Sequence, residues 1–377
     1  MTAFLRARLP HDLSWELAYR VLLSASFIAV LVYPLVLASG KISSYVFEPS
    51  GEWRSPAEID QQFRENFPLR GRARRIMSRL PLGQLPNNVV RGKDDWLFYR
   101  AEISGDGHVL DDLAGQLTPS PAALVQWRAV MAKRQAEVEQ AGGVFLAVVA
   151  PNKETIYSDR LPLRYRAVGH AKSRMDWVAE ALPDSLLMDL RPVLRQARRS
   201  EAPRSVYFAT DTHWNPLGAL AAYRAVVDRL RTRFPTLVPL AESDFQVIPQ
   251  ERVGDLTNMA GKKTVESTFF LSPKKPLSAR CPDIRQVLLA ENGTSCQPTL
   301  NEHFITTQDR DDLPTAVVFH DSFMVFMLPY LAQNFRRVVF MWGKYDAALV
   351  AQEKPDVVLQ ESVERYLPHL FQTKESP

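Results

Sequence analysis

An aspartate and a histidine, Asp211 and His213, lie two residues apart in the 377-residue chain, and Ser322 follows about a hundred residues later. A histidine held by a carboxylate can take the proton of a serine hydroxyl, which turns that oxygen into a nucleophile toward an acyl carbon. Side chains two residues apart on an extended segment point to the same side, so the carboxylate and the imidazole can touch. The set therefore predicts acyl-transfer chemistry, with Ser322 as nucleophile, His213 as base and Asp211 as its orienting acid.

The same residue types can also have ordinary structural roles. An Asp-x-His pattern arises often by chance, and Asp321 or Ser322 could simply cap the helix expected after them. His320 could act as the base in place of His213, or it could line the pocket. A metal site of Asp211, His213 and Asp321 is a further alternative, but no additional histidine or carboxylate stands at a convincing spacing, so we predict neither a metal nor a cofactor.

Short apolar runs alternate with helical patterns, which predicts an α/β domain with a parallel sheet flanked by helices. Strands are expected at 144–150, 185–190, 206–209, 315–319, 337–342 and 356–360, and helices at 118–141, 172–182, 216–230, 323–335 and 345–353. Because the carboxyl ends of parallel strands share one edge of a sheet, the Asp-x-His segment and the serine turn would meet there. The serine, placed between a strand and a helix, would also lie near backbone N–H groups that could hold an oxyanion.

Four further residues near these strand ends are candidates for binding substrate or an oxyanion. They are Lys153, Trp214, His320 and Phe323. Lys153 follows a predicted buried strand, where such sheets bind ligands, although a lone lysine is more often solvated surface. Trp214 beside the histidine could stack on a sugar, but an aromatic residue in such a run more often belongs to the core.

The N-terminal part of the chain contains an uncharged, apolar run at 21–39 that is long enough to cross a membrane as one helix. Arginines before it favour a cytoplasmic location for residues 1–20. A cleaved signal peptide is the alternative, but the run is longer than the usual apolar region and lacks a good cleavage site. We therefore expect a membrane-proximal linker and helical segment at 40–90, and one α/β domain at 91–370 outside the cytoplasm.

Two cysteines, Cys281 and Cys296, lie in a loop-rich insertion expected at about 239–298. They form no CxxC motif and have no zinc-binding spacing. Free thiols would suit a cytosolic domain, whereas a domain outside the cytoplasm favours a disulfide between them. The net charge is only +4 and no dense basic run with interleaved aromatic residues is present, so we predict no nucleic-acid partner.

Several stretches taken together resemble the alginate O-acetyltransferase family of the AlgJ/AlgX type. These stretches are Phe63–Arg70, Gly92–Phe98, Tyr207–Trp214, Gly254–Leu256, Asp321–Phe323 and Lys354–Arg365. They occur in the order found in that family and extend roughly over residues 60–367. A set of motifs in the right order is more specific than any one of them.

The resemblance implies an SGNH-hydrolase-like fold, permuted so that the nucleophilic serine comes late in the chain. It implies transfer of acetyl groups to hydroxyls of an exopolysaccharide through an acetyl-serine formed on Ser322, with His213 as base and Asp211 as the orienting acid. It also implies a membrane-bound O-acyltransferase as acetyl donor, and a single-pass protein of the inner membrane whose catalytic domain lies in the periplasm. The short stretch after Ser322 is typical of the anchored form of the family, which has no carbohydrate-binding module.

Two other functions fit the same residues. An esterase would use the same serine, histidine and aspartate, but water rather than a sugar hydroxyl would attack the acyl-enzyme. A non-catalytic, polysaccharide-binding subunit of an export or modification complex would not need the three residues, and all three are present. The transferase is therefore our first hypothesis.

Overall fold

The structure is a computed structural model that describes residues 88–100, 108–165, 172–262, 264–280, 288–290, 293–295 and 304–372. The chain divides into two compact units, Met1–Gln84 and Leu85–Pro377. All of the described residues belong to the second unit, so the account below concerns that unit alone.

Several predictions fall outside the described residues. They are the membrane helix at 21–39, nearly all of the segment at 40–90, and both cysteines, Cys281 and Cys296. Among the helices of the described ranges, none is both long and apolar enough to span a bilayer. The membrane helix and the disulfide therefore stay predictions.

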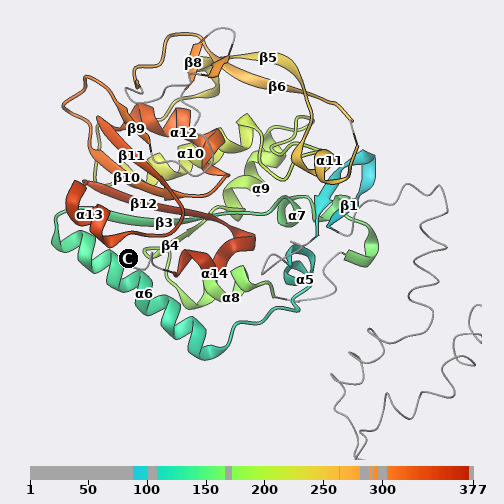
Figure 1. The fold of residues 1–377 in the computed structure, drawn as a ribbon, viewed down its shortest axis with the longest axis horizontal. Helices are drawn as coiled ribbons and strands as arrows, with labels where there is room; N and C mark the ends of the chain where they lie inside the picture. The colour runs from blue at the N-terminus through green and yellow to red at the C-terminus, as the bar shows by residue number, and fades with distance from the viewer. Residues whose placement is uncertain are drawn as a thin grey trace, which may run out of the picture. The chain divides into compact units, whose positions relative to one another are not determined.

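A six-stranded sheet forms the centre of the unit, in the order β4-β3-β12-β10-β11-β9 (Figure 1). The strands are β3 (Val144–Ala150), β4 (Leu187–Asp189), β9 (Phe304–Thr307), β10 (Thr315–His320), β11 (Arg337–Trp342) and β12 (Val357–Val363). Five strands pair in parallel, whereas β9 pairs antiparallel with β11. Only a short connection joins β9 to β10, and a parallel arrangement would need a long crossover. The sheet is therefore mixed, not wholly parallel as predicted.

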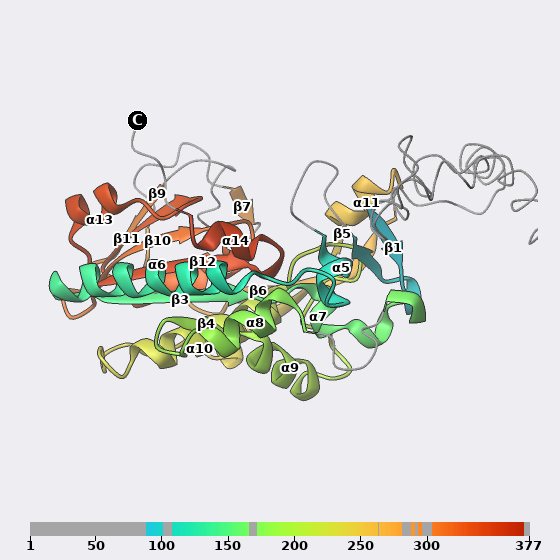
Figure 2. The same cartoon turned by 90° about the horizontal axis from the view of Figure 1, so that it is seen from below.

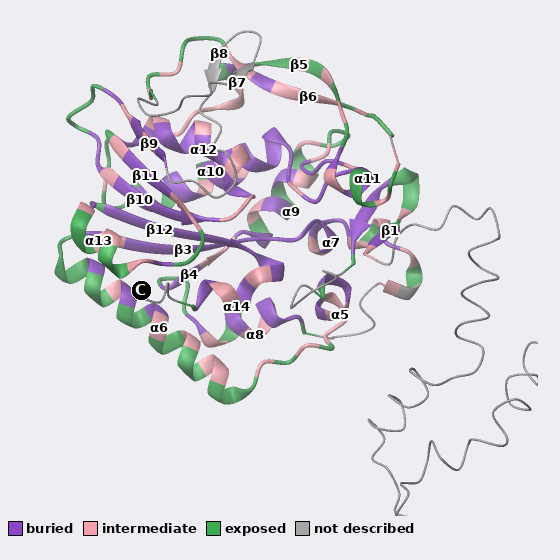
Figure 3. Cartoon of the chain, in the orientation of Figure 1, coloured by how far each residue is buried: buried purple, intermediate pink, exposed green. Residues whose placement is uncertain are grey.

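Helices cover both faces of this sheet, as predicted (Figure 1). One face packs against α9 (Arg191–Ser200), α10 (Pro216–Leu230) and α12 (Met324–Leu331). The other face packs against α6 (Pro121–Gln140), α8 (Arg174–Ala181), α13 (Ala347–Glu353) and α14 (Leu367–Leu370). Figure 3 shows the central strands buried, with the outer side of α6 exposed. A strand covered on both faces must be apolar throughout, which explains the continuous run in β3.

Local signals set the ends of the predicted helices. The Ser120 hydroxyl accepts a hydrogen bond from the N–H of Ala123 and so caps the start of α6. Gly142 follows the end of α6 with a φ of +85°, which a residue with a Cβ rarely adopts. Asn215 caps α10, and Pro216 occupies the first turn, where its missing N–H costs nothing.

Shorter elements gather at the end of the sheet where the carboxyl ends of the parallel strands lie (Figure 2). They are β1 (Val89–Arg91), β2 (Leu97–Tyr99), α5 (Val109–Leu113), α7 (Lys153–Ile156) and α11 (Asp255–Met259). The described residues also contain single 3-10 turns. They are η1 (Lys93–Asp95), η2 (Ser158–Arg160), η3 (Leu163–Tyr165), η4 (Glu242–Asp244), η5 (Ala332–Asn334) and η6 (Glu364–Tyr366).

The segment predicted as a loop-rich insertion is more regular than expected. It contains a long antiparallel hairpin of β5 (Phe245–Arg252) and β6 (Glu266–Pro273), and a small pair of β7 (Leu288–Ala290) and β8 (Gly293–Ser295). Most residues of β5 are exposed or half-buried, so its sequence lacks the apolar alternation that identifies a strand. Conversely, the strand predicted at 206–209 is only an isolated bridge between Tyr207 and Trp214.

Candidate active site

The loop that carries Asp211 and His213 is held by charged side chains from distant parts of the chain. The ammonium group of Lys153, which is fully buried, donates to the carbonyl oxygens of residues 208, 209 and 211, at 3.2, 3.2 and 2.6 Å. The carboxylate of Glu266 on β6 accepts from the backbone N–H groups of residues 209 and 210. The loop backbone is thus fixed without a regular strand.

A glycine lets the polypeptide before α11 pack directly on this loop. A Cβ atom at Gly254 would lie 2.1 Å from the carbonyl oxygen of Thr210, which no side chain tolerates. The close approach brings two more polar side chains to the loop, Arg252 from the end of β5 and Asp255 from the start of α11.

Asp211 is buried and each of its carboxylate oxygens has partners. Oδ1 lies 2.7 Å from Nδ1 of His213, and Oδ2 accepts from Nη2 of Arg252 at 2.9 Å and from the backbone N–H of Asp255 at 3.2 Å. Burial disfavours the charged carboxylate, but the hydrogen bond from His213 and the positive charge of Arg252 outweigh it and hold the pKa of Asp211 well below its usual range. Asp211 is therefore an ionised acceptor.

His213 joins this carboxylate to the serine. Its Nε2 lies 2.8 Å from Oγ of Ser322, while its Nδ1 faces Asp211. Because an ionised carboxylate only accepts, we assign the proton to Nδ1, and the lone pair of Nε2 is then free to accept the serine O–H. The structure thus brings together Asp211, His213 and Ser322, as the sequence predicted.

Ser322 stands in the turn between β10 and α12. The carboxylate of Asp321 fixes this turn, since Oδ1 accepts from the N–H of Phe323 at 2.9 Å and Oδ2 from the N–H of Val363 at 2.7 Å. The indole of Trp214 donates to the carbonyl oxygen of Phe323 at 2.9 Å, which ties the serine turn to the histidine loop. Within the described ranges, the N–H of Ser322 donates to no other group.

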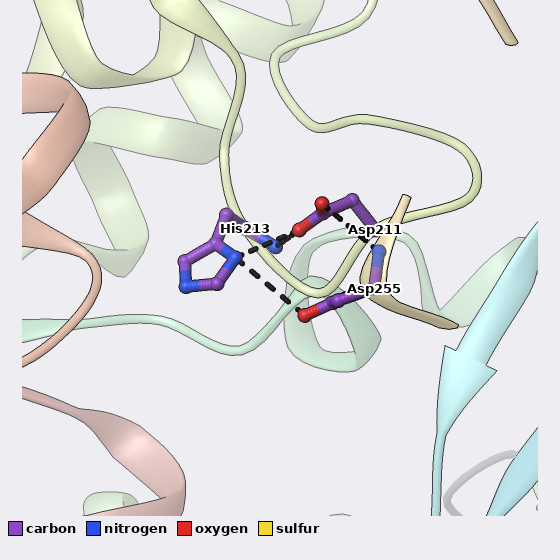
Figure 4. Close-up of side chains that lie close together, drawn as sticks. All are labelled: Asp211, His213 and Asp255. Carbon is purple, nitrogen blue, oxygen red and sulfur yellow. Dashed lines mark hydrogen bonds and ion pairs between the residues drawn. The ribbon is translucent and has the colours of Figure 1, made fainter. Parts of the chain in front are cut away.

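A second carboxylate stands beside the histidine (Figure 4). Asp255 accepts from the backbone N–H of Thr212 at 2.7 Å and from its hydroxyl at 2.5 Å, and its Oδ2 lies 3.7 Å from Nδ1 of His213. The hydroxyl of Thr212 also lies 3.3 Å from Nδ1. Asp255 therefore fixes the residue before His213 and places a negative charge close to the imidazole.

Asp211, His213 and Asp255 offer ligand atoms within 4.8 Å of one another, a spacing that a metal ion could use. A metal would have to replace the proton of Nδ1 and compete with Arg252 for Asp211. Each of these side chains has hydrogen-bond partners within the protein, so the donor set is explained without a metal. The alternative ligand Asp321 is occupied by the backbone of the serine turn.

The four residues predicted to bind substrate or an oxyanion are all buried, and their role in binding stays a prediction. Lys153 is fully enclosed and supports the histidine loop through three carbonyl oxygens. Trp214 and Phe323 pack edge to face in the core beneath the site, with ring centroids 5.1 Å apart. His320 packs edge-on against Phe340 and Trp342, and burial lowers the pKa of its imidazole.

Sequence reasoning missed the side chains that hold the loop. Arg252 and Glu266 belong to the hairpin that was expected to be irregular, and neither stands in a pattern that signals a role. Asp255 lies in the stretch 254–256 that resembles the family, and this resemblance is the one signal for it in the sequence. Its contact with Thr212 depends on the close packing at Gly254, which only the folded chain reveals.

Residues 89–287 match the family described as "SGNH hydrolase-like domain, acetyltransferase AlgX". The match covers more than half of the chain and includes the loop with Asp211 and His213. This chain belongs to that family. Its membership confirms the resemblance and the predicted SGNH-like α/β fold, and it agrees with the predicted class of enzyme.

Two curated relatives of this SGNH-like family member are named "Probable alginate O-acetylase AlgJ". The one from Pseudomonas aeruginosa is 28% identical over 183 residues, which cover 47% of this chain and 46% of that protein. The one from Pseudomonas putida is 25% identical over 304 residues, which cover 74% of this chain and 70% of that protein. The chain thus matches less than half of the length of the first relative.

A solved structure of Bacillus cereus PatB1 with a sulfonyl adduct is similar to this SGNH-like unit. The TM-score is 0.56 at 17% sequence identity, and the match covers 78% of this chain and 99% of that chain. At this identity the likeness concerns the fold. It supports the α/β architecture of the family as the frame that holds Asp211, His213 and Ser322.

Proposed function

We propose that this protein is an O-acetyltransferase that moves acetyl groups to hydroxyls of an alginate-like exopolysaccharide. The observation that carries the proposal is the hydrogen-bonded series in which Oγ of Ser322 lies 2.8 Å from Nε2 of His213, whose Nδ1 lies 2.7 Å from Asp211. The names of the two alginate O-acetylase relatives support the acetyl group and the polysaccharide.

The first half of the proposed reaction forms an acetyl-serine. Nε2 of His213 takes the hydroxyl proton of Ser322 as Oγ attacks the carbonyl carbon of an acetyl donor, and Asp211 stabilises the resulting imidazolium. The tetrahedral intermediate then breaks its bond to the leaving oxygen, and the imidazolium returns the proton to that oxygen. The N–H of Ser322, which has no acceptor in the described ranges, is available to the oxyanion.

The second half transfers the acetyl group. A sugar hydroxyl attacks the acetyl carbon and gives its proton to Nε2 of His213. The bond to Oγ breaks, Ser322 regains the proton, and the acetylated sugar leaves. We propose a membrane-bound O-acyltransferase as the protein that supplies the acetyl group.

Hydrolysis by water at the second step would make the protein an esterase, and one experiment separates the two. The full-length protein is incubated with an activated acetyl ester in the presence and absence of oligosaccharides. Acetylated sugar that requires Ser322 supports the transferase. Ester cleavage at the same rate in both conditions, without acetylated sugar, indicates an esterase. If Ser322→Ala retains both activities, the assignment of the nucleophile is wrong.

We also propose that the catalytic unit lies in the periplasm, anchored to the inner membrane by residues 21–39, with a disulfide between Cys281 and Cys296. The uncharged N-terminal run and the polysaccharide function support this location. Labelling of free thiols before and after reduction, in intact cells, tests both points. Labelling of both cysteines without reduction would contradict the disulfide.

A further inference from the structure

A second site lies beside the serine turn, at Arg365. This residue follows β12 in the turn η6, and only 7% of its surface is exposed. Its carbonyl oxygen accepts from Arg174, but within the described ranges its guanidinium makes no hydrogen bond and no ion pair. Its Nε is buried without a partner. A guanidinium has five N–H donors, so this arrangement leaves an unusual number of them unused.

Two buried carboxyl groups lie near Arg365, and neither forms an ion pair with it. Burial, together with the charge of Asp321, raises the pKa of Glu361 well above its usual value, although the positive charge of Arg365 acts to lower it. Burial also raises the pKa of Glu154, against the same positive charge, and Oε1 of Glu154 accepts from the backbone N–H of Tyr99 at 2.6 Å. Within the described ranges, the guanidinium therefore has no anion in direct contact with it.

Aromatic rings surround the guanidinium and connect it to the serine turn. Its central carbon lies 5.2 Å from the ring centroid of Phe323, 5.8 Å from that of Tyr99 and 5.2 Å from that of Tyr366. The Phe323 ring, next to Ser322 in sequence, lies 4.9 Å from the ring of His213. The ends of β12 and β10 are also tied together by the hydrogen bond from Val363 to Asp321. The guanidinium and the nucleophile thus share one end of the sheet.

Enclosing an unpaired charge is costly unless an anion joins it. A planar guanidinium suits a pair of negatively charged oxygens. We propose that Arg365 binds a negatively charged oxygen of the reacting complex beside Ser322. Two groups supply this chemistry: the carboxylate of an acidic acceptor sugar, and the oxyanion on the acetyl carbon. The inference rests on the proposed function, and it adds a specific anion-binding residue to the site.

The test uses the full-length protein with Arg365→Gln and Arg365→Lys. Acylation is measured as the burst of 4-nitrophenol released from 4-nitrophenyl acetate without an acceptor. Transfer is measured to a uronate oligosaccharide and to the same oligosaccharide after its carboxyl groups are reduced to neutral alcohols. Arg134→Gln is the matched control, because Arg134 is also a buried arginine over an aromatic ring, but it packs against the opposite face of the sheet.

The two sources of the anion give different results. If the oxyanion is the ligand, Arg365→Gln slows the acylation burst about 100-fold, and Arg365→Lys, which keeps the charge, restores part of it. If the acceptor carboxylate is the ligand, the burst is unchanged, and transfer to the uronate falls about tenfold or more while transfer to the neutral oligosaccharide does not.

Two results would overturn the inference. One is a wild-type protein that transfers acetyl groups while Arg365→Gln matches Arg134→Gln in all three rates. The other is an unchanged burst with an equal fall in transfer to the acidic and the neutral acceptor. In both cases the proposed function stands. A wild-type protein that shows no acylation burst instead removes the proposed function, and the inference falls with it. Circular dichroism of each variant shows that a lost rate does not come from an unfolded chain.

Discussion

Nη2 of Arg252 lies 2.9 Å from Oδ2 of Asp211, on the carboxylate oxygen that does not face His213. The arginine therefore occupies the second oxygen and leaves the first to the imidazole. Its guanidinium also stacks over Phe208 of the same loop at 4.9 Å. This contact fixes the orientation of Asp211 from a strand that lies about forty residues further along the chain.

Arg252→Ala should lower the rate of acetyl transfer about tenfold, because a misplaced Asp211 orients His213 less well. A tenfold change in rate corresponds to about 1.4 kcal/mol of activation free energy. It should also reduce the free energy of unfolding by about 1–3 kcal/mol, since Asp211 keeps its charge but loses a buried partner. Steady-state kinetics and urea denaturation measure the two effects. Arg231→Ala removes an exposed arginine that pairs with Asp228 and should change neither quantity.

Asp255→Asn should lower the rate of acetyl transfer about three- to tenfold. The carboxylate lies 3.7 Å from Nδ1 of His213, so its negative charge favours the imidazolium that forms as Ser322 gives up its proton. The amide retains an oxygen that can accept from Thr212, so the loop should stay in place. Asp312→Asn, a surface control, should leave the rate unchanged. A rate in Asp255→Asn equal to that of the wild type would show that Asp255 only holds the loop.

Lys153→Met should destabilise the protein by about 3 kcal/mol or more. Methionine fills similar space but donates no hydrogen bond, so three carbonyl oxygens of the histidine loop would lose their partner. Acetyl transfer should fall as well, since this loop carries His213. Thermal and urea denaturation measure the first effect. Lys172→Met is the control, because Lys172 is exposed, pairs with Glu180 and lies over the ring of Trp177, and donates to no backbone carbonyl oxygen in the described ranges. A similar loss of stability in both variants would contradict the role given to Lys153.

Glu364 predicts a pH dependence of stability. Burial is the main cause that raises its pKa to about 7, from an ordinary value of 4.5. The folded state therefore holds this proton more tightly than the unfolded state, so its contribution is fully present below about pH 4.5 and is lost as the pH rises through 7. Glu364→Gln keeps an oxygen that can accept from Asn152 and Thr155 and should remove this fall of about 3 kcal/mol. Urea denaturation at pH 5 and pH 8 measures the free energy of unfolding at each pH. If this free energy changes between the two pH values by the same amount in the wild type and in Glu364→Gln, the assignment is wrong.

The sequence predicted the parts of this fold that local physics decides. The apolar run of β3 indicates a strand buried on both faces, and Asn215 with Pro216 marks the start of α10. The meeting of His213 and Ser322 was predicted from the rule that the carboxyl ends of parallel strands share one edge of a sheet. The rule holds for Ser322 after β10, whereas His213 reaches that edge on a loop and not on a strand of the sheet. Each of these inferences depends only on a few neighbouring residues or on the expected arrangement of strands in the sheet.

The rest of the site depends on contacts that no local pattern encodes. Whether Lys153 faces solvent, substrate or a loop backbone is decided by where residues 208–211 fold, and the same residue type would suit each case. Glu266 and Arg252 stand on a hairpin whose strands are half exposed and so lack a clear period. Their partners lie some forty to sixty residues away, and only the three-dimensional packing of that hairpin on the loop gives them a role.

The assignment of Ser322 as the acetylated nucleophile is the central claim, and it can be measured directly. Full-length protein is mixed with an activated acetyl ester, quenched in acid within the first turnover, digested and mapped by mass spectrometry. We predict one acetyl group on the peptide that contains Ser322, its absence in Ser322→Ala, and its much slower appearance in His213→Ala. Acetyl transfer that continues in Ser322→Ala, or rapid acetylation at another residue in the wild type, would contradict the account.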